Sequence, residues 1–78
     1  MTKIDKIVDQ FFNRPTSLRY AEIEKALLHL GFEKIEAKGS HKKFKHSVLS
    51  HDLIIPVHNH KCKDFYKKQA ANVARKIK

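Results

Sequence analysis

Gly39-Ser40-His41-Lys42-Lys43-Phe44-Lys45-His46 combines a flexible two-residue corner with a run of lysines that surrounds one aromatic side chain. Side chains of a β-strand point alternately to its two faces. As a strand, this run therefore directs Phe44 to the core and His41, Lys43 and Lys45 to solvent. Lys42 and His46 share the side of Phe44, so they are expected near the strand ends, where they can reach water.

Two further strands flank this run. Phe32 to Ala37 carries three charged residues, which is typical of an edge or two-sided strand. Lys38-Gly39-Ser40 forms the corner, and residues 47–52 form a polar turn. Leu53-Ile54-Ile55, closed by Pro56, is the most apolar strand, so we expect it to be the central or best-covered one. Three strands at this spacing predict a small antiparallel meander.

Helices are predicted on both sides of the meander. The first, over residues 3–12, is predicted by apolar residues at helical spacing, with Thr2 and Asp5 placed as a capping box. The second runs from about Tyr20 to Leu30 and ends at Gly31, which suits a left-handed cap. The third runs from about Asp64 to Ile77, with basic residues, Lys78 included, near its end. The expected buried stripes are Ile4, Ile7, Val8, Phe11 and Phe12; Ile23, Ala26, Leu27 and Leu30; and Tyr66, Ala70, Val73 and Ile77.

The order helix, helix, three strands, helix indicates an α+β fold with helices on one face of the sheet. The other face then stays wet and carries His41, Lys43 and Lys45. The 78 residues are enough for one domain with a modest core.

Composition and charge limit the possible functions. Fourteen lysines and three arginines against eight acidic residues give a net charge of +9, which predicts a polyanionic partner such as nucleic acid or an acidic protein. There is no apolar run of about 18 residues and no signal-peptide pattern, so no membrane association is expected. The single Cys62 cannot form an internal disulfide. We therefore expect a cytoplasmic protein.

Three short motifs together carry a family resemblance. Leu30-Gly31-Phe32, Gly39-Ser40-His41 and Ile55-Pro56-Val57-His58-Asn59 occur at this spacing in one short basic chain. In this respect the chain resembles the HicA toxin family, the mRNA interferases of bacterial toxin–antitoxin pairs. The resemblance covers about Tyr20 to Ile77, so residues 1–78 are interpreted as a single domain with an extension (1–19) and a core (20–78).

The resemblance implies a fold similar to a double-stranded-RNA-binding domain and an activity of ribosome-independent mRNA cleavage. It places the catalytic histidine at His41. It implies a HicB-type antitoxin as partner, which blocks the toxin and joins it in a repressor complex, so DNA would be contacted only indirectly. Many members carry Gly-Thr before the last helix. This chain has Lys61-Cys62-Lys63-Asp64-Phe65-Tyr66 there, and no role for backbone amides is carried over to that helix start.

The chemistry of RNA cleavage fits these residues. RNA supplies its own nucleophile, the 2′-hydroxyl, so an enzyme needs a base, an acid and positive charge, and no metal cofactor. His41 can serve as general acid or base near neutral pH. Lys42, Lys43 and Lys45 would stabilise charge on the phosphate, with Gly39 and Ser40 as supporting residues. On the residues alone, one histidine at a turn is more often incidental than catalytic, and the resemblance favours catalysis.

His58 is the second candidate. It follows the third strand, so it could approach His41 as the complementary acid, bind phosphate, or cap the loop. His58, His60 and Cys62 also suggest a metal site, but a structural zinc site needs four ligands in paired spacings, so none is expected. Phe44 and Tyr66 fall on apolar stripes and are interpreted as core residues.

Two other functions fit the charge. The first is a non-catalytic RNA-binding module of the same fold, which would bind phosphates and 2′-hydroxyls. The second is a structural subunit whose basic surface binds an acidic protein. Only a catalytic role for His41 separates the enzyme from the first of these.

Overall fold

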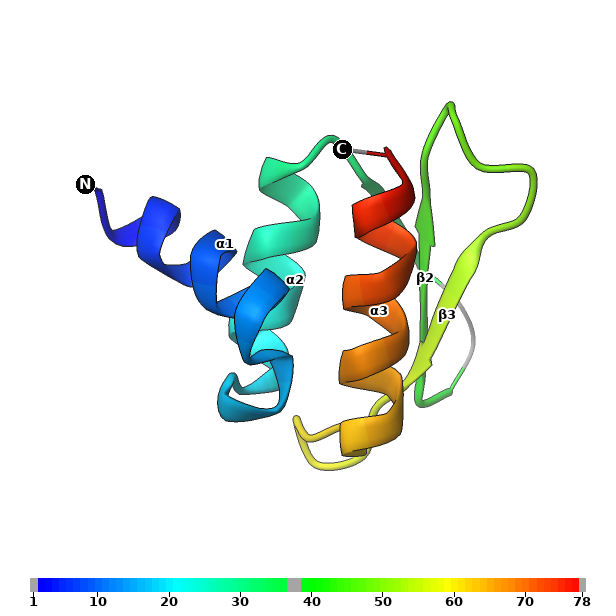
Figure 1. Ribbon diagram of the computed structural model, residues 1–78. Helices are drawn as coiled ribbons and strands as arrows, with labels where there is room; N and C mark the ends of the chain where they lie inside the picture. The colour runs from blue at the N-terminus through cyan, green and yellow to red at the C-terminus, as the bar shows by residue number, and fades with distance from the viewer. Residues whose placement is uncertain (1, 37–38, 78) are drawn as a thin grey trace.

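The computed structural model of the protein describes residues 2–36 and 39–77 (Figure 1). The elements follow the order α1 (Lys3–Asn13), η1 (Pro15–Ser17), α2 (Tyr20–His29), β1 (Glu33–Glu36), β2 (His41–Lys45), β3 (Leu53–Pro56) and α3 (Asp64–Ile77). The element η1 is one turn of 3-10 helix. The predicted α+β class is therefore confirmed. The expectations for Ala37, Lys38 and Lys78 lie outside the described residues.

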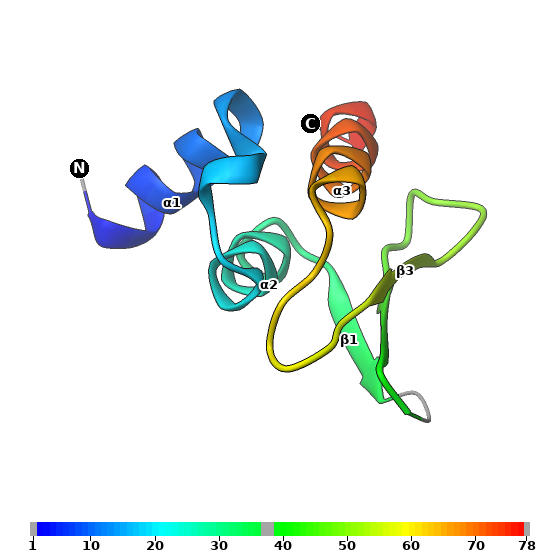
Figure 2. The same cartoon turned by 90° about the horizontal axis from the view of Figure 1, so that it is seen from below.

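The helices lie on one side of the sheet (Figure 2). Helix α3 packs against β3 and α2, and α1 packs against α2, α3 and η1 on the side away from the sheet. Lys34 Nζ lies 2.8 Å from Glu24 Oε1, an ion pair that joins β1 to α2. From α2 onward the order helix, three antiparallel strands, helix is compatible with the fold of a double-stranded-RNA-binding domain. None of the described helices is long and apolar enough to cross a membrane.

The central strand of the sheet is β2, which pairs antiparallel with β1 and with β3. Of the two expectations for β3, the central position is therefore wrong, because a meander places each strand beside its neighbour in sequence. The other expectation is confirmed, since β3 has two buried residues and β2 has one. The apolarity of β3 follows instead from its contact with α3. Leu53 and Ile55 are buried, while Ile54 points to the other face and is 49% exposed. Pro56 suits an edge strand because it has no N–H to donate.

The core lies between the sheet and the helices. Its largest fully buried side chains are Phe11, Phe44, Leu18, Ile23, Leu27 and Ile55. Phe44 is the only residue of β2 in the buried class, as the alternation predicts. His46 follows the strand and is half-buried. Its ring centroid lies 5.1 Å from that of Phe32, and its Nδ1 accepts a hydrogen bond from the Val48 N–H.

Helix α1 begins at the predicted capping box. Thr2 Oγ1 accepts from the Asp5 N–H, and the Asp5 carboxylate accepts from the Thr2 N–H. Ile7 and Phe11 are buried, and the rest of the predicted stripe is partly buried against the core. Arg75 of α3 donates to the carbonyl of Phe12. These contacts attach α1 firmly to the helix layer.

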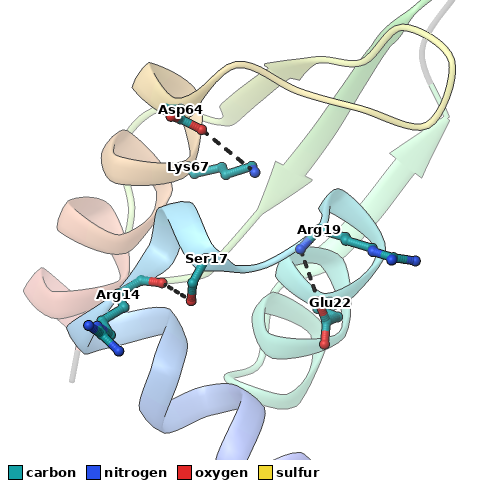
Figure 3. Close-up of polar contacts among 6 residues, drawn as sticks. All are labelled: Arg14, Ser17, Arg19, Glu22, Asp64 and Lys67. Atoms are coloured by element: carbon teal, nitrogen blue, oxygen red, sulfur yellow. Dashed lines mark hydrogen bonds and ion pairs between the residues drawn. The ribbon is translucent and has the colours of Figure 1, made fainter.

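Two short connections place α2 (Figure 3). The Ser17 hydroxyl donates to the Arg14 carbonyl within the η1 turn, and Glu22 accepts from the Arg19 N–H at the start of α2. At the other end, Gly31 has φ +97°, the left-handed geometry that the sequence predicts for the cap.

Helix α3 has the predicted bounds but a wider buried face. Ala70, Ala71 and Ala74 are buried, while Tyr66, Val73 and Ile77 are only partly buried. The helix lies between β3 on one side and η1 and α1 on the other. Alanines permit this close approach on both sides.

Removing the Phe11 ring tests how firmly α1 belongs to the core. We expect Phe11→Ala to lower the free energy of unfolding by about 3 kcal/mol or more, because it leaves a cavity in the core. Lys6→Ala, on the exposed side of the same helix, should change it by less than about 0.5 kcal/mol. Urea denaturation followed by circular dichroism measures both. Equal effects from the two variants would show that α1 does not pack as described.

The Glu24 carboxylate should make stability depend on pH. Burial on its own raises the pKa of Glu24, but hydrogen bonds from Lys34 and Tyr20 outweigh it and hold the pKa below the usual 4.5. A lowered pKa stabilises the fold above the ordinary value, and this stabilisation is lost as the pH falls through the folded-state pKa. We expect Glu24→Gln to lower the free energy of unfolding by roughly 0.5 kcal/mol at pH 7, and this difference to shrink as the pH falls below 4.5. A difference that persists unchanged at pH 3 would contradict this account.

Candidate functional site

The face of the sheet away from the helices carries the predicted histidine and lysines. In the register of the sheet, His41 pairs with Pro56, and Lys43 lies between Ile35 of β1 and Ile54 of β3. All of these side chains point away from the side that buries Phe44. We call this surface the open face. In the described part of the chain, no helix covers it.

His41 is the first residue of β2 and is exposed. Gly39, two residues before His41, has φ +74°, a backbone conformation that favours glycine. A Cβ atom at Gly39 would meet no other atom within 4 Å, so the backbone angle rather than space calls for glycine there. The Ser40 carbonyl accepts from the Val57 N–H at 2.6 Å. This bond extends the pairing of β2 and β3 beyond His41 and fixes where the strand begins.

His58 lies close to His41 on the same face. The pairing of Ser40 with Val57 continues the alternation of β3, so His58 points to the side of Pro56 while Val57 is buried. His41 pairs with Pro56, which makes His58 its diagonal neighbour. Such positions lie about 7–8 Å apart, within reach of one bridging phosphate group.

A tight turn holds His58 in place. His58 and Lys61 exchange two backbone hydrogen bonds, of 2.8 and 2.9 Å, across Asn59 and His60. Both central residues have positive φ, 52° and 63°, as a type I′ hairpin turn requires. Residues directly opposite each other in such a pair direct their side chains to the same side. The turn therefore directs the side chains of His58 and Lys61 to the same side of the chain.

A surface hollow of about 350 Å³ opens beside this pair. Pro56, His58, Lys61, Cys62, Lys63 and Tyr66 line it. It begins at the register partner of His41 and ends at the first turn of α3. Sequence reasoning did not single out Lys61 and Lys63 as site residues, although they come three and five residues after His58 and could have indicated a basic segment there.

The predicted lysines do not all lie together. Lys43 is on the open face, but its Nζ lies 3.3 Å from Asp52 Oδ2. Lys45 is on the same face at the far end of β2, about 13 Å from His41 at the usual rise of a strand. Lys42 is on the opposite, helix-covered side, where its charge contributes to lowering the pKa of Glu24. The structure therefore groups His41, His58 and Lys43, and it does not bring Lys42 to them.

The region around the hollow also contains two aromatic rings and a thiol. The ring centroids of Phe65 and Tyr66 lie 5.2 Å apart, edge to face, and Phe65 is 67% exposed. Phe44 is a core residue as predicted, whereas Tyr66 is only partly buried and forms part of the hollow. Burial raises the pKa of the Cys62 thiol, which keeps it uncharged at neutral pH.

The start of α3 sits beside the hollow. Asp64 Oδ1 and Lys67 Nζ are 3.7 Å apart across the first turn of the helix, as Figure 3 shows. Within residues 2–36 and 39–77, no group of three or more His, Cys, Asp or Glu side chains is arranged to hold a metal ion. The side chains in and around the hollow carry an imidazole, ammonium groups, an aromatic ring, the Cys62 thiol and the Asp64 carboxylate.

The comparisons with known proteins bear on what this arrangement serves. Residues 20–78 match the family model described as HicA toxin of bacterial toxin-antitoxin. Searches of curated proteins and of solved structures gave no match. The matched region begins at α2 and includes the whole sheet, the turn at His58 and α3. The chain therefore belongs to the HicA toxin family of bacterial toxin–antitoxin systems.

Proposed function

We propose that this toxin is a metal-independent endoribonuclease that cleaves mRNA and so inhibits translation. One observation carries the proposal: His41 and His58 occupy diagonal positions on the open face, with Lys43 and Lys61 near them. Two imidazoles at this separation can transfer protons on both sides of one phosphodiester. The exposure of both side chains gives a polymer access to them.

In the proposed reaction, the 2′-hydroxyl of the RNA attacks the adjacent phosphorus. Neutral His41 accepts the proton of this hydroxyl, and protonated His58 donates a proton to the departing 5′-oxygen. The new bond joins the 2′-oxygen to phosphorus, and the bond from phosphorus to the 5′-oxygen breaks. The products are a 2′,3′-cyclic phosphate and a 5′-hydroxyl. Lysine ammonium groups stabilise the extra negative charge of the transition state.

The lysines contribute unequally to this scheme. Lys43 lies two residues from His41 on the same face and is the nearer phosphate contact within β2. Lys45 would contact a phosphate further along the strand of RNA. Lys42 would add only long-range attraction from the helix side. Gly39 and Ser40 serve by shaping the corner that presents His41.

A partner of HicB type, acting in the cytoplasm, fits the same surface. The net charge of +9 favours an acidic protein as the partner, and such a protein could cover the exposed His41 and exclude RNA. In a repressor complex, contact with DNA would then come through the antitoxin.

Substitution of His41 tests the enzymatic role. With EDTA present, purified wild-type protein should cut a single-stranded RNA, and His41→Ala should cut it about 10²–10⁴-fold more slowly, because one general acid–base group is lost. The matched control is His29→Ala, which removes an exposed histidine of α2. It should leave the rate unchanged. Gel analysis of end-labelled RNA gives the rates.

Two outcomes would contradict the proposal. If wild type and His41→Ala bind RNA equally and neither cuts it, the protein is a non-catalytic RNA-binding module. If both cut it at the same rate, His41 has no catalytic role and another group carries the reaction.

Release of Lys43 from its acidic partner should strengthen RNA binding. We expect Asp52→Asn to lower the Kd for RNA about two- to fivefold at low salt. This change corresponds to the small interaction free energy of an exposed ion pair, which Lys43 no longer has to give up on binding RNA. Asp9→Asn is the control, since it makes the same change in net charge on α1, behind the helix layer. Fluorescence anisotropy measures both. Equal gains from the two variants would show that only net charge matters and that Lys43 does not contact RNA.

A further inference from the structure

The first turn of α3 presents a large aromatic ring to solvent within a basic surface. Phe65 is 67% exposed, as much as any large hydrophobic residue described. Lys68 lies three residues further along, on the same side of the helix. Removing so large an apolar surface from water is favourable, so a partner with a flat apolar face and negative charge would suit this ring and the lysines near it.

The hollow beside His58 leads to this ring. Tyr66 lines the hollow and meets Phe65 edge to face. Lys61 and Lys63 stand on the rim and are exposed. The hollow thus has the register partner of His41, Pro56, on its lining, together with Tyr66, which contacts the exposed ring.

We propose, building on the function given above, that the hollow and the Phe65 ring form a nucleotide-binding subsite for single-stranded RNA. One base stacks against the aromatic pair Phe65 and Tyr66, and Lys61 and Lys63 contact its flanking phosphates. Alternating aromatic and cationic groups are how proteins hold single-stranded nucleic acid. The subsite sets which nucleotide beside the cleaved bond the enzyme accepts.

The occupant is single-stranded because a duplex does not offer a free base. In a double helix both faces of each base are already stacked, and proteins contact it through phosphates and 2′-hydroxyls. A phenylalanine ring adds nothing to such contacts. Burial keeps the Cys62 thiol uncharged, so it adds no negative charge that would repel a phosphate in the hollow.

The test is equilibrium binding of a 2′-fluoro RNA oligonucleotide, which lacks the nucleophile and cannot be cut by the proposed route. We expect Phe65→Ala to raise its Kd by about 5- to 100-fold, the effect of losing one stacked base. Because no charge is removed, the slope of log Kd against log salt should not change. Lys61→Ala should instead reduce that slope by roughly 0.7.

Two controls and a second variant complete the test. Val48→Ala removes apolar surface from a side chain that is also 67% exposed, in the turn before β3, and should leave the Kd unchanged. Tyr66→Leu keeps apolar volume in the hollow without the flat ring and should also weaken binding. A duplex of the same length should bind wild type and Phe65→Ala equally.

The outcomes separate this proposal from the enzymatic one. Equal Kd values for wild type, Phe65→Ala and Val48→Ala would overturn the subsite, as would a loss of duplex binding equal to that of single-strand binding. If Phe65→Ala weakens single-strand binding while wild type fails to cut ordinary RNA, the subsite stands and the endoribonuclease proposal is wrong.

Discussion

Burial of Phe44 in the middle of β2 is the constraint from which the arrangement of the open face follows. The side chain is fully buried, and strand alternation then sends His41, Lys43 and Lys45 outward. A shift of the strand register by one residue would expose the Phe44 ring and bury the ammonium groups of Lys43 and Lys45 in the apolar core. The free-energy cost of such burial is prohibitive. The core therefore fixes the register, and the register presents the histidine.

The second constraint is the tight turn after β3. Asn59 and His60 both adopt left-handed backbone angles, which cost free energy for residues other than glycine. The two hydrogen bonds between His58 and Lys61 hold the turn closed. The turn directs the side chains of His58 and Lys61 to the same side, and both line the hollow that reaches the start of α3. The first constraint is the packing of one side chain, and the second is a pair of backbone hydrogen bonds; each sets the direction of a histidine at the surface.

Periodicity and capping predicted much of the fold. The bounds of α3, the capping box of α1 and the left-handed cap at Gly31 came directly from residue types at fixed spacings. The position of β3 in the sheet was harder to predict, because its apolar residues reflect packing against α3 and do not indicate whether the strand is central or at an edge. The burial of Ala71 and Ala74 was also missed, since a single stripe cannot show that a helix is packed on two sides.

The candidate site, like the fold, could be predicted only in part. Alternation predicted that His41 and Lys43 share a face, and the structure places them so. The pairing of Lys43 with Asp52 depends on a turn whose path the sequence does not specify. Likewise, the positions of Lys61 and Tyr66 around the hollow depend on how a two-residue turn folds back. Contacts between neighbouring strands could be read from spacing, whereas contacts through turns needed the three-dimensional structure.

The chemical nature of the RNA ends tests the central claim most directly. If the open face activates the 2′-hydroxyl between two histidines, the fragments carry a 2′,3′-cyclic phosphate and a 5′-hydroxyl. Mass spectrometry of the products from a short defined RNA, cut in the presence of EDTA, distinguishes these ends from others. We predict the cyclic phosphate on the upstream fragment. A 3′-hydroxyl on that fragment and a 5′-phosphate on the other would show that water is the nucleophile, and would contradict the account.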